Sequence, residues 1–430
     1  MPSANTADFE DGPVELTDKR KDALNTALDG LGKQKQTAQV LKPYTKFARW
    51  WTRSEDLFIN WYSVLDRGLA WMSRSFGELS QSQFQAKYEA DLAIYKDMVH
   101  GVTCFEQDLS YFEDPENVER KDDLAKAMIA ASAAARSEDI SSLSKAILVY
   151  VEEADSGTKL LPAISARVKK CESHGFKHPI LGRLLCPIKY LDNLNENPAE
   201  YLKKLDNGNV KVRSRDMPSF LWPKDGYDCE QMEENMFRNP ILVMVWKHIF
   251  TCPSSALKDG PGRTKTRSSQ AKMNKMSSVT PGSIAYACLM LRHSISDIED
   301  WRTEDKLFKR EEFYEFIMAL FDDGDDEESD WVKDTIEWWN AQVFGSEPKS
   351  VDDSDNELGP STLAIIKKQR DQRRAQEARK AKAQTSVTSI ADRATPARDP
   401  HPAPRAHSPP RSPGPRQSPR RSSHTSGNNR

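Results

Sequence analysis

The chain has 430 residues, with 62 Lys and Arg against 65 Asp and Glu, 37% hydrophobic residues and a mean hydropathy of −0.72. A typical globular domain is about 45–50% apolar, so part of this chain lacks the composition of a packed core. No apolar run approaches the ~20 residues that a membrane-spanning helix needs. The acidic N-terminus also lacks the basic and apolar regions of a secretory signal, so we expect no contact with a membrane.

The charge is unevenly distributed along the chain. Residues 351–430 hold 16 Lys and Arg, 8 Asp and Glu and no aromatic residue, whereas residues 1–350 hold 46 and 57. A segment so poor in apolar residues cannot bury enough surface to offset its chain entropy. We therefore expect an acidic folded body, with a disordered acidic N-terminus at 1–14 and a disordered basic tail at 346–430. The six Cys form no Cys-x-x-Cys pair, which predicts reduced thiols.

Helical spacing dominates the first part of the body. Apolar residues recur at every third or fourth position from Leu57 to Met72, with Ser54 as the expected N-cap, and again from Phe84 to Val102. Residues 119–169 add more helix, including an Ala-rich stretch. Long amphipathic helices with short connections favour an antiparallel bundle, which we place at residues 15–170.

A second helical domain is expected at residues 171–345, and its start is rich in loops because Gly and Pro punctuate it. Asn239-Pro240 and Thr280-Pro281 are each typical of a helix cap followed by Pro at the first helical position. The apolar run at 241–246 fits a central helix, although a buried strand fits nearly as well. The predicted fold class is all-α, and the pattern leaves open whether the body is one domain or two.

Four motifs in this order resemble an uncharacterised protein family of mushroom-forming basidiomycete fungi, whose genes occur in many copies per genome. They are His174-Gly-Phe-Lys-His-Pro-Ile-Leu-Gly-Arg-Leu-Leu-Cys-Pro187, Ile249-Phe-Thr-Cys-Pro-Ser-Ser255, Val279-Thr-Pro-Gly-Ser-Ile-Ala-Tyr286 and Glu337-Trp-Trp-Asn-Ala-Gln-Val-Phe344. The similarity covers about residues 136–344 and implies no activity, cofactor or partner. Members of that family tend to carry an Asp-Trp pair shortly after the Cys-Pro, where this chain has Ile188-Lys-Tyr-Leu-Asp192.

The sequence favours a non-enzymatic protein, and we predict no catalytic residue and no cofactor. It contains no Gly-x-Ser-x-Gly, no phosphate-binding Gly-x-x-x-x-Gly-Lys-Ser/Thr and no His-Glu-x-x-His. One set of residues has the ligand types of a structural zinc site, namely Cys171, His174, His178 and Cys186. Its spacing matches no known zinc motif. The interpretation that we favour is therefore a buried Cys beside partly exposed His residues.

A basic loop lies between the two Pro-started helices. Between residues 258 and 276 it carries six cations against one acid, Asp259, on a body that is otherwise acidic. These cations are Lys258, Arg263, Lys265, Arg267, Lys272 and Lys275. Positive charge concentrated in one place can neutralise phosphates while the remaining surface repels them. The loop is thus a candidate nucleic-acid contact, and its alternative is a solvated surface loop.

The tail contains a helix-compatible segment at 361–384 with eight basic and two acidic residues. Basic clusters of this density serve as nuclear-import sequences or as nucleic-acid patches, although a solvated charged helix is the alternative. The import candidates are Lys367, Lys368, Arg370, Arg373, Arg374, Arg379, Lys380 and Lys382.

Short motifs in the tail predict phosphorylation. Thr395, Ser408 and Ser418 are each followed by Pro and a basic residue, as proline-directed kinases prefer, and Ser350 and Ser354 each have an acid three residues later. Each phosphate adds about −1.5 to −2 charges. Modification of the three proline-directed sites would cancel most of the tail's positive charge.

These features support three hypotheses. The first is a nuclear interaction protein that engages nucleic acid or chromatin and is regulated by phosphorylation of its tail. The second is a helical scaffold for protein partners, nuclear or cytoplasmic, whose tail serves only import or solubility. The third is an enzyme of unrecognised chemistry or a protein derived from a mobile element. The sequence does not predict an oligomeric state.

Overall fold

The computed structural model of the chain describes residues 16–30, 37–117, 119–165, 167–257, 269–322 and 330–345. Within these ranges the protein is all-α, because the only β pairing consists of two isolated bridges, Pro187 with Pro218 and Asp305 with Phe308. The all-α prediction is therefore confirmed for this part of the chain. None of the helices described is both long enough and apolar enough to cross a membrane. The expected disordered segments, at 1–14 and 346–430, lie outside the described residues.

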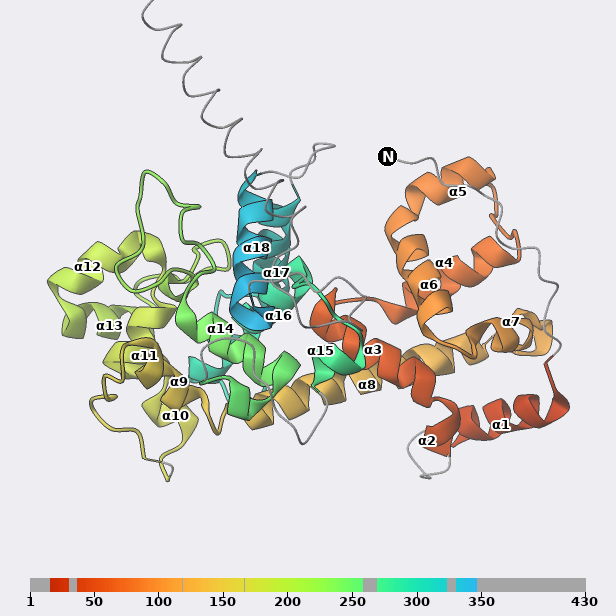
Figure 1. Cartoon of the computed structure of the whole chain (residues 1–430), viewed down its shortest axis with the longest axis horizontal. Coiled ribbons are helices and arrows are strands. Elements are labelled where there is room, and N and C mark those ends of the chain that lie inside the picture. The colour runs from red at the N-terminus through yellow and green to blue at the C-terminus, as the bar shows by residue number, and fades with distance from the viewer. Residues whose placement is uncertain are drawn as a thin grey trace, which may run out of the picture. The chain divides into compact units, whose positions relative to one another are not determined.

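The first part of the body is a group of helices around its own core (Figure 1). The helices are α1 (Asp18–Asp29), α2 (Thr37–Val40), α3 (Lys42–Ser54), α4 (Trp61–Met72), α5 (Gln81–Lys87), α6 (Glu89–Gly101), α7 (Phe105–Glu113) and α8 (Arg120–Leu143). Helix α4 packs against α6 and α8, and α3 packs along α8. The N-terminal core gathers buried residues between Leu16 and Met128, among them Trp61, Tyr95 and Phe105.

Two details of the predicted N-terminal helices are wrong. Ser54 is the last residue of α3, and the N-cap of α4 is Asn60, whose side chain accepts a hydrogen bond from Ser63 N. The expected helix from Phe84 to Val102 is split at Tyr88 into α5 and α6. Ser80 closes a capping box with Gln83 at the start of α5. Apolar spacing continues across such breaks, so it does not place helix ends.

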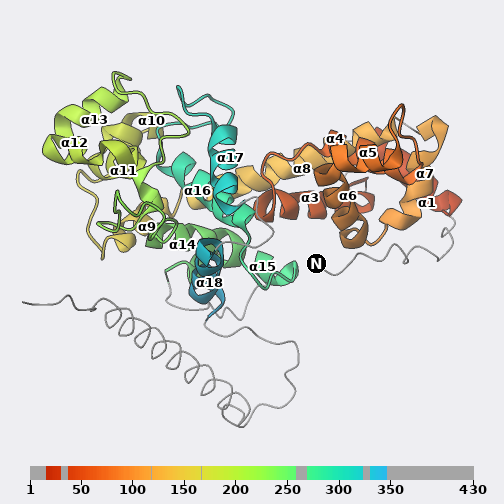
Figure 2. The ribbon, with the colours of Figure 1, turned by 90° about the horizontal axis from the view of Figure 1, so that it is seen from above.

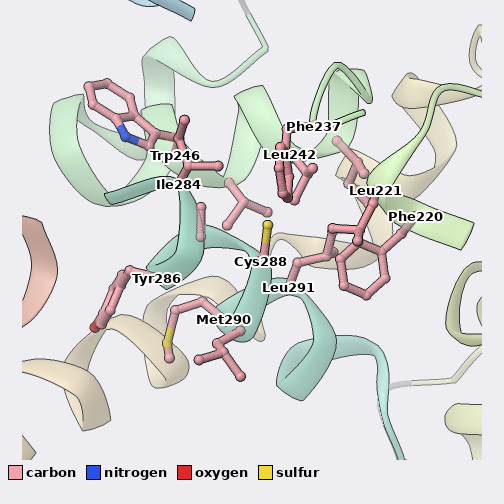
Figure 3. Close-up of a cluster of buried hydrophobic side chains, with 14 of the residues drawn as sticks. Phe220, Leu221, Phe237, Leu242, Trp246, Ile284, Tyr286, Cys288, Met290 and Leu291 are labelled. Atoms are coloured by element: carbon pink, nitrogen blue, oxygen red, sulfur yellow. The ribbon is translucent and has the colours of Figure 1, made fainter. Parts of the chain in front are cut away.

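The second part of the body surrounds one buried helix, α16 (Figure 2). Its helices are α9 (Ile147–Ala154), α10 (Lys170–Ser173), α11 (Pro179–Leu185), α12 (Leu191–Glu196), α13 (Pro198–Asp206), α14 (Pro240–Trp246), α15 (Gln270–Met273), α16 (Pro281–Ile295), α17 (Arg310–Phe321) and α18 (Asp330–Phe344). Every residue of α16 from Gly282 to Ile295 is buried. In Figure 3, Cys288 and Leu291 of α16 point toward Leu242 and Leu221, and Tyr286 points to the opposite side.

Both predicted Pro-started helices are confirmed. Asn239 caps α14 by accepting a hydrogen bond from Ile241 N, and Thr280 caps α16 with a capping box to Ser283. The run at 241–246 is therefore a helix, not a strand, and it continues as a π-helical turn from Lys247 to Thr251. The loop-rich start of this region holds only short helices, from α10 to α13.

Helix α8 belongs to both cores. Met128 in its first half lies in the N-terminal core, and Leu143 at its end lies in the core around α16. The described residues up to Gly345 form one compact unit. The two cores thus meet along α8. That residues 15–170 and 171–345 fold as separate domains remains a prediction.

A buried ion pair joins α3, α8 and α16. The Arg53 guanidinium donates to both carboxylate oxygens of Asp139, with Nε to Oδ2 at 2.6 Å and Nη2 to Oδ1 at 2.8 Å. The Tyr286 hydroxyl donates to Asp139 Oδ2 at 2.7 Å. Burial disfavours the charged guanidinium, but the hydrogen bond and charge of Asp139 outweigh it, so the pKa of Arg53 is raised above its ordinary value.

The start of α16 packs directly on the end of α3. A Cβ added at Gly282 would lie 2.1 Å from the Glu55 carbonyl oxygen, so only glycine permits this approach. The Thr280 hydroxyl donates to the Ser54 carbonyl, and the Tyr314 hydroxyl of α17 donates to the Glu55 carbonyl at 2.7 Å. The last carbonyls of α3 are thereby satisfied by the second part of the body.

We expect Asp139→Asn to lower the free energy of unfolding by about 3–5 kcal/mol, because it leaves the Arg53 charge buried without its partner. The matched control is the adjacent Glu138→Gln, which breaks the more exposed ion pair of Arg49 with Glu138 and should cost less than about 1 kcal/mol. Urea unfolding of both variants measures the difference. Equal losses would show that the Arg53–Asp139 pair is not needed to join the three helices.

We expect Gly282→Ala to cost about 3 kcal/mol or more, because the added methyl group meets a backbone carbonyl that cannot move independently. Gly77→Ala is the control, since a Cβ there meets nothing within 4 Å but its φ is +61°. That backbone strain alone should cost about 1 kcal/mol. Thermal unfolding that ranks the two variants in the reverse order would contradict the close packing of α16 on α3.

Candidate nucleic-acid interface

The structure describes two of the six cations of the predicted basic loop. Lys272 lies in α15 and Lys275 follows it, and both side chains are exposed. Neither makes an ion pair with another described residue. Lys258, Arg263, Lys265 and Arg267 lie outside the described residues. The described end of the loop therefore presents two ammonium groups to solvent.

Helix α15 is short and is fixed at both ends. The Ser269 side chain accepts a hydrogen bond from Lys272 N at 3.1 Å, and Ala271 is buried in the core around α16. After Lys275, which has a positive φ of 56°, the chain turns back so that Met276 N donates to the Ala271 carbonyl at 2.8 Å. This anchoring keeps α15 beside the π-helical turn that follows α14.

A cavity of about 220 Å³, which we call the basic cavity, is shared by α3 and α15. It is lined by Lys42, Thr45, Lys46, Arg49, Trp50, Arg53, Gln270 and Asn274. No carboxylate is present among these lining residues. Two helices more than 200 positions apart in sequence thus line an open cavity whose walls are cationic, neutral polar and, at Trp50, aromatic.

The cations of α3 that line the basic cavity lie on one face of the helix. Lys42, Lys46, Arg49 and Arg53 are spaced by four, three and four residues, which is the spacing of a single helical face. The segment from Lys42 to Ser54 contains no acidic residue. Helix α3 therefore carries a line of four basic side chains along its cavity side.

The opposite face of α3 fixes its orientation. Tyr44, Ala48 and Thr52 are buried in the first part of the body. The Tyr44 hydroxyl donates to Asp108 Oδ2 at 2.7 Å, and the Thr52 hydroxyl donates to Ser132 Oγ at 2.7 Å. These contacts prevent rotation of α3, so its cationic face remains directed at α15.

The cations of the basic cavity differ in how far they are neutralised. Arg53 is buried and paired with Asp139, and Arg49 pairs with the exposed Glu138 at the rim. Lys42 and Lys46 are exposed and make no ion pair with any residue that the structure describes. Lys42 and Lys46 thus leave uncompensated positive charge at the cavity, and Lys272 and Lys275 add exposed positive charge on and just after α15. Such a surface attracts a polyanion to one place on an acidic body.

The α3 half of this site was not predicted from the sequence. The loop is conspicuous in the sequence because six cations fall within nineteen residues, whereas the cations of α3 are each separated by two or three uncharged residues. The available signal was the four-three-four spacing of Lys42, Lys46, Arg49 and Arg53 in a stretch without acids. Their proximity to α15 is a tertiary property, which no local pattern encodes.

The four residues of the zinc hypothesis lie in different surroundings. No group of three or more His, Cys, Asp or Glu in the described part of the chain is placed to hold a metal ion. His178 caps α11, since its Nδ1 accepts from Ile180 N and Leu181 N, and its Nε2 contacts the Pro162 carbonyl at 2.9 Å. Burial raises the pKa of Cys186 to about 12 and lowers that of His174 to about 4, whereas Cys171 is exposed.

A hydrogen-bonded chain of Ser142, His248 and Tyr150 superficially resembles a nucleophile with its base. His248 Nε2 lies 2.8 Å from Ser142 Oγ, and Nδ1 lies 2.8 Å from the Tyr150 hydroxyl. Burial raises the pKa of Tyr150 to about 12 and lowers that of His248. A neutral phenol cannot stabilise an imidazolium as a carboxylate does. We interpret the chain as a structural link between α8, α9 and the π-helical turn.

A larger cavity of about 450 Å³ lies near the start of α17. Its charged lining residues have both signs, three cations and four glutamates, and Lys309 there pairs with Glu312 at 2.8 Å. The aromatic ring of Trp301 is already contacted by the guanidinium groups of Arg136 and Arg310, at 5.0 and 4.9 Å from the ring centroid. Mixed charges and an occupied ring make this cavity a weaker candidate than the basic cavity.

All the tail candidates lie outside the described residues. This holds for the import residues Lys367, Lys368, Arg370, Arg373, Arg374, Arg379, Lys380 and Lys382, and for the phosphorylation candidates Ser350, Ser354, Thr395, Ser408 and Ser418. They remain predictions from sequence.

Comparison with known protein families places most of the second part of the body in a family of unknown function. The model of a family of unknown function, DUF6698, matches residues 130–344, from the middle of α8 to the end of α18. No curated protein and no solved structure matches the chain. The matched range contains α15 but not α3.

Proposed function

The chain belongs to the DUF6698 family, and we propose that it is a non-enzymatic nuclear interaction protein that engages nucleic acid or chromatin through its basic segments. The observation that carries this proposal is the basic cavity, where Lys42, Lys46, Arg49 and Arg53 of α3 face the α15 segment without a lining carboxylate. Phosphate contacts from Lys and Arg supply most of the affinity for nucleic acid.

The net charge of the body adds to this proposal. Residues 1–350 carry 46 basic and 57 acidic residues, so most of their surface repels a polyanion. Binding would then be confined to the α3 and α15 surface, continued in sequence by the cations at 258–268. The tail would add nuclear import and a second, less specific contact. Phosphorylation there would weaken that contact by adding negative charge.

Two alternatives remain as hypotheses. A helical scaffold for protein partners would use the tail only for import or solubility. The other is a mobile-element protein or an enzyme of unrecognised chemistry. The sequence resemblance to a fungal family with many gene copies per genome supports the mobile-element form of this hypothesis. Among the residues that the structure describes, no contact or cavity favours either alternative over nucleic-acid binding at the basic cavity.

The central test is K42E/K46E in the full chain, measured by fluorescence anisotropy with labelled RNA and DNA over a salt series that includes 150 mM. Removing two phosphate contacts should weaken binding and reduce the slope of log K against log salt by about two. R263E/K265E/R267E tests the loop in the same assay. A tail present in every variant contributes equally to each, so the differences report on the body.

K96E/K203E provides the matched control for this test. Both lysines are exposed, lie on α6 and α13, and do not line the basic cavity. The control changes the net charge by the same amount. If it weakens binding as much as K42E/K46E does, the effect is one of overall charge and the basic cavity is not the nucleic-acid site.

Deletion of residues 361–430 separates the first two hypotheses. With an unrelated import signal attached, the shortened protein should reach the nucleus. Under our proposal its occupancy of chromatin or RNA should nevertheless be lower than that of the full chain, because the tail contributes positive charge to binding. Nuclear fractionation and crosslinking measure this occupancy. Complete recovery by the import signal alone would favour the scaffold.

A further inference from the structure

Trp50 is the aromatic residue among those that line the basic cavity. It directly follows Arg49 and lies one helical turn after Lys46 on the cationic face of α3. Its half-buried ring meets Phe250 edge-on, with 6.0 Å between the ring centroids. This contact with the core around α16 holds the indole in place. A fixed aromatic ring among cations is the arrangement on which single-stranded nucleic acids stack their bases.

Two side-chain amides of α15 line the same cavity. Asn274 Nδ2 donates to the Gln270 backbone carbonyl at 2.8 Å, which leaves the Asn274 side-chain oxygen available as an acceptor. The Gln270 amide makes no hydrogen bond with another described residue, although the side chain is half-buried. Amides offer both donors and acceptors. They can therefore pair with the edge of a base that reaches the cavity.

The size of the basic cavity limits what it can hold. About 220 Å³ is below the roughly 300–1,000 Å³ of pockets for drug-sized ligands, so one flat ring fits better than a whole cofactor. In a duplex the bases remain stacked and paired, and a recessed side chain meets only the backbone. An unpaired base can leave the stack and enter the cavity.

We infer that the basic cavity receives one unpaired nucleobase, stacked on Trp50 and contacted by Gln270 and Asn274, while Lys42, Lys46 and Arg49 hold the flanking phosphates. The partner is therefore a single-stranded nucleic acid. This inference rests on the proposed function and narrows it, because phosphate contacts alone would not distinguish a single strand from a duplex.

The test compares a labelled 12-nucleotide oligouridine with an RNA duplex of equal length at 150 mM salt, using the full chain. We expect the single strand to bind at least about tenfold more tightly. Trp50→Ala should weaken single-strand binding by about tenfold, within the range measured for loss of one base stack, and should leave duplex binding unchanged. Gln270→Ala should weaken only the single strand, by a smaller factor.

Trp71→Ala is the matched control, because Trp71 is also half-buried but packs against Phe76 and Phe84 in the first part of the body. Circular dichroism and thermal unfolding establish that each variant is folded. Should Trp50→Ala unfold, two milder variants still test the site. Trp50→Phe retains apolar packing at this position, and Gln270→Ala leaves that packing untouched.

The outcomes separate the two proposals. The base-binding inference would be overturned if single strand and duplex bound equally well and neither Trp50→Ala nor Gln270→Ala had an effect. If binding still depended on Lys42 and Lys46 in that case, the proposed function would stand. Binding that does not depend on Lys42 and Lys46 at all would overturn both.

Discussion

The Arg53–Asp139 ion pair is the constraint on which the arrangement of the body depends. It lies where α3, α8 and α16 meet. Tyr286, on the central helix α16, donates a further hydrogen bond to the Asp139 carboxylate. Two charges withdrawn from water gain little net stability even when well paired. What such a pair provides is specificity, because any other register of α3 against α8 would leave a guanidinium or a carboxylate buried alone.

This fixed register has a consequence on the other side of α3. The end of α3 packs against Gly282, and the Ser54 and Glu55 carbonyls accept hydrogen bonds from the Thr280 and Tyr314 hydroxyls. Its length and rotation are thereby set by contacts with the core around α16. The cationic positions that do not enter the core must then lie toward α15. The basic cavity is in this sense a by-product of how the two parts of the body are joined.

The parts of the fold that sequence predicted are those with local causes. Asn239-Pro240 and Thr280-Pro281 mark helix starts because the cap and the Pro act within one turn, and both were placed correctly. Ser54 was misassigned because a capping residue type is common, and apolar spacing continues through the break between α3 and α4. The cavity residues on α3 were missed for a different reason. They line a cavity only because α15, more than 200 residues away, packs beside them and because Asp108, Ser132 and Asp139 set the rotation of α3.

The position of the basic cavity relative to the family match bears on what the family shares. The match at 130–344 contains Asp139, α15 and α16, but Arg53 and the whole cationic face of α3 lie before it. The family region alone would carry one wall of the cavity and half of the buried ion pair. An isolated Asp139 in that position would either take up water or need another cation. If the cavity binds nucleic acid, that property follows from the union of the α3 segment with the family region, so a relative without a basic helix at that place would lose the site.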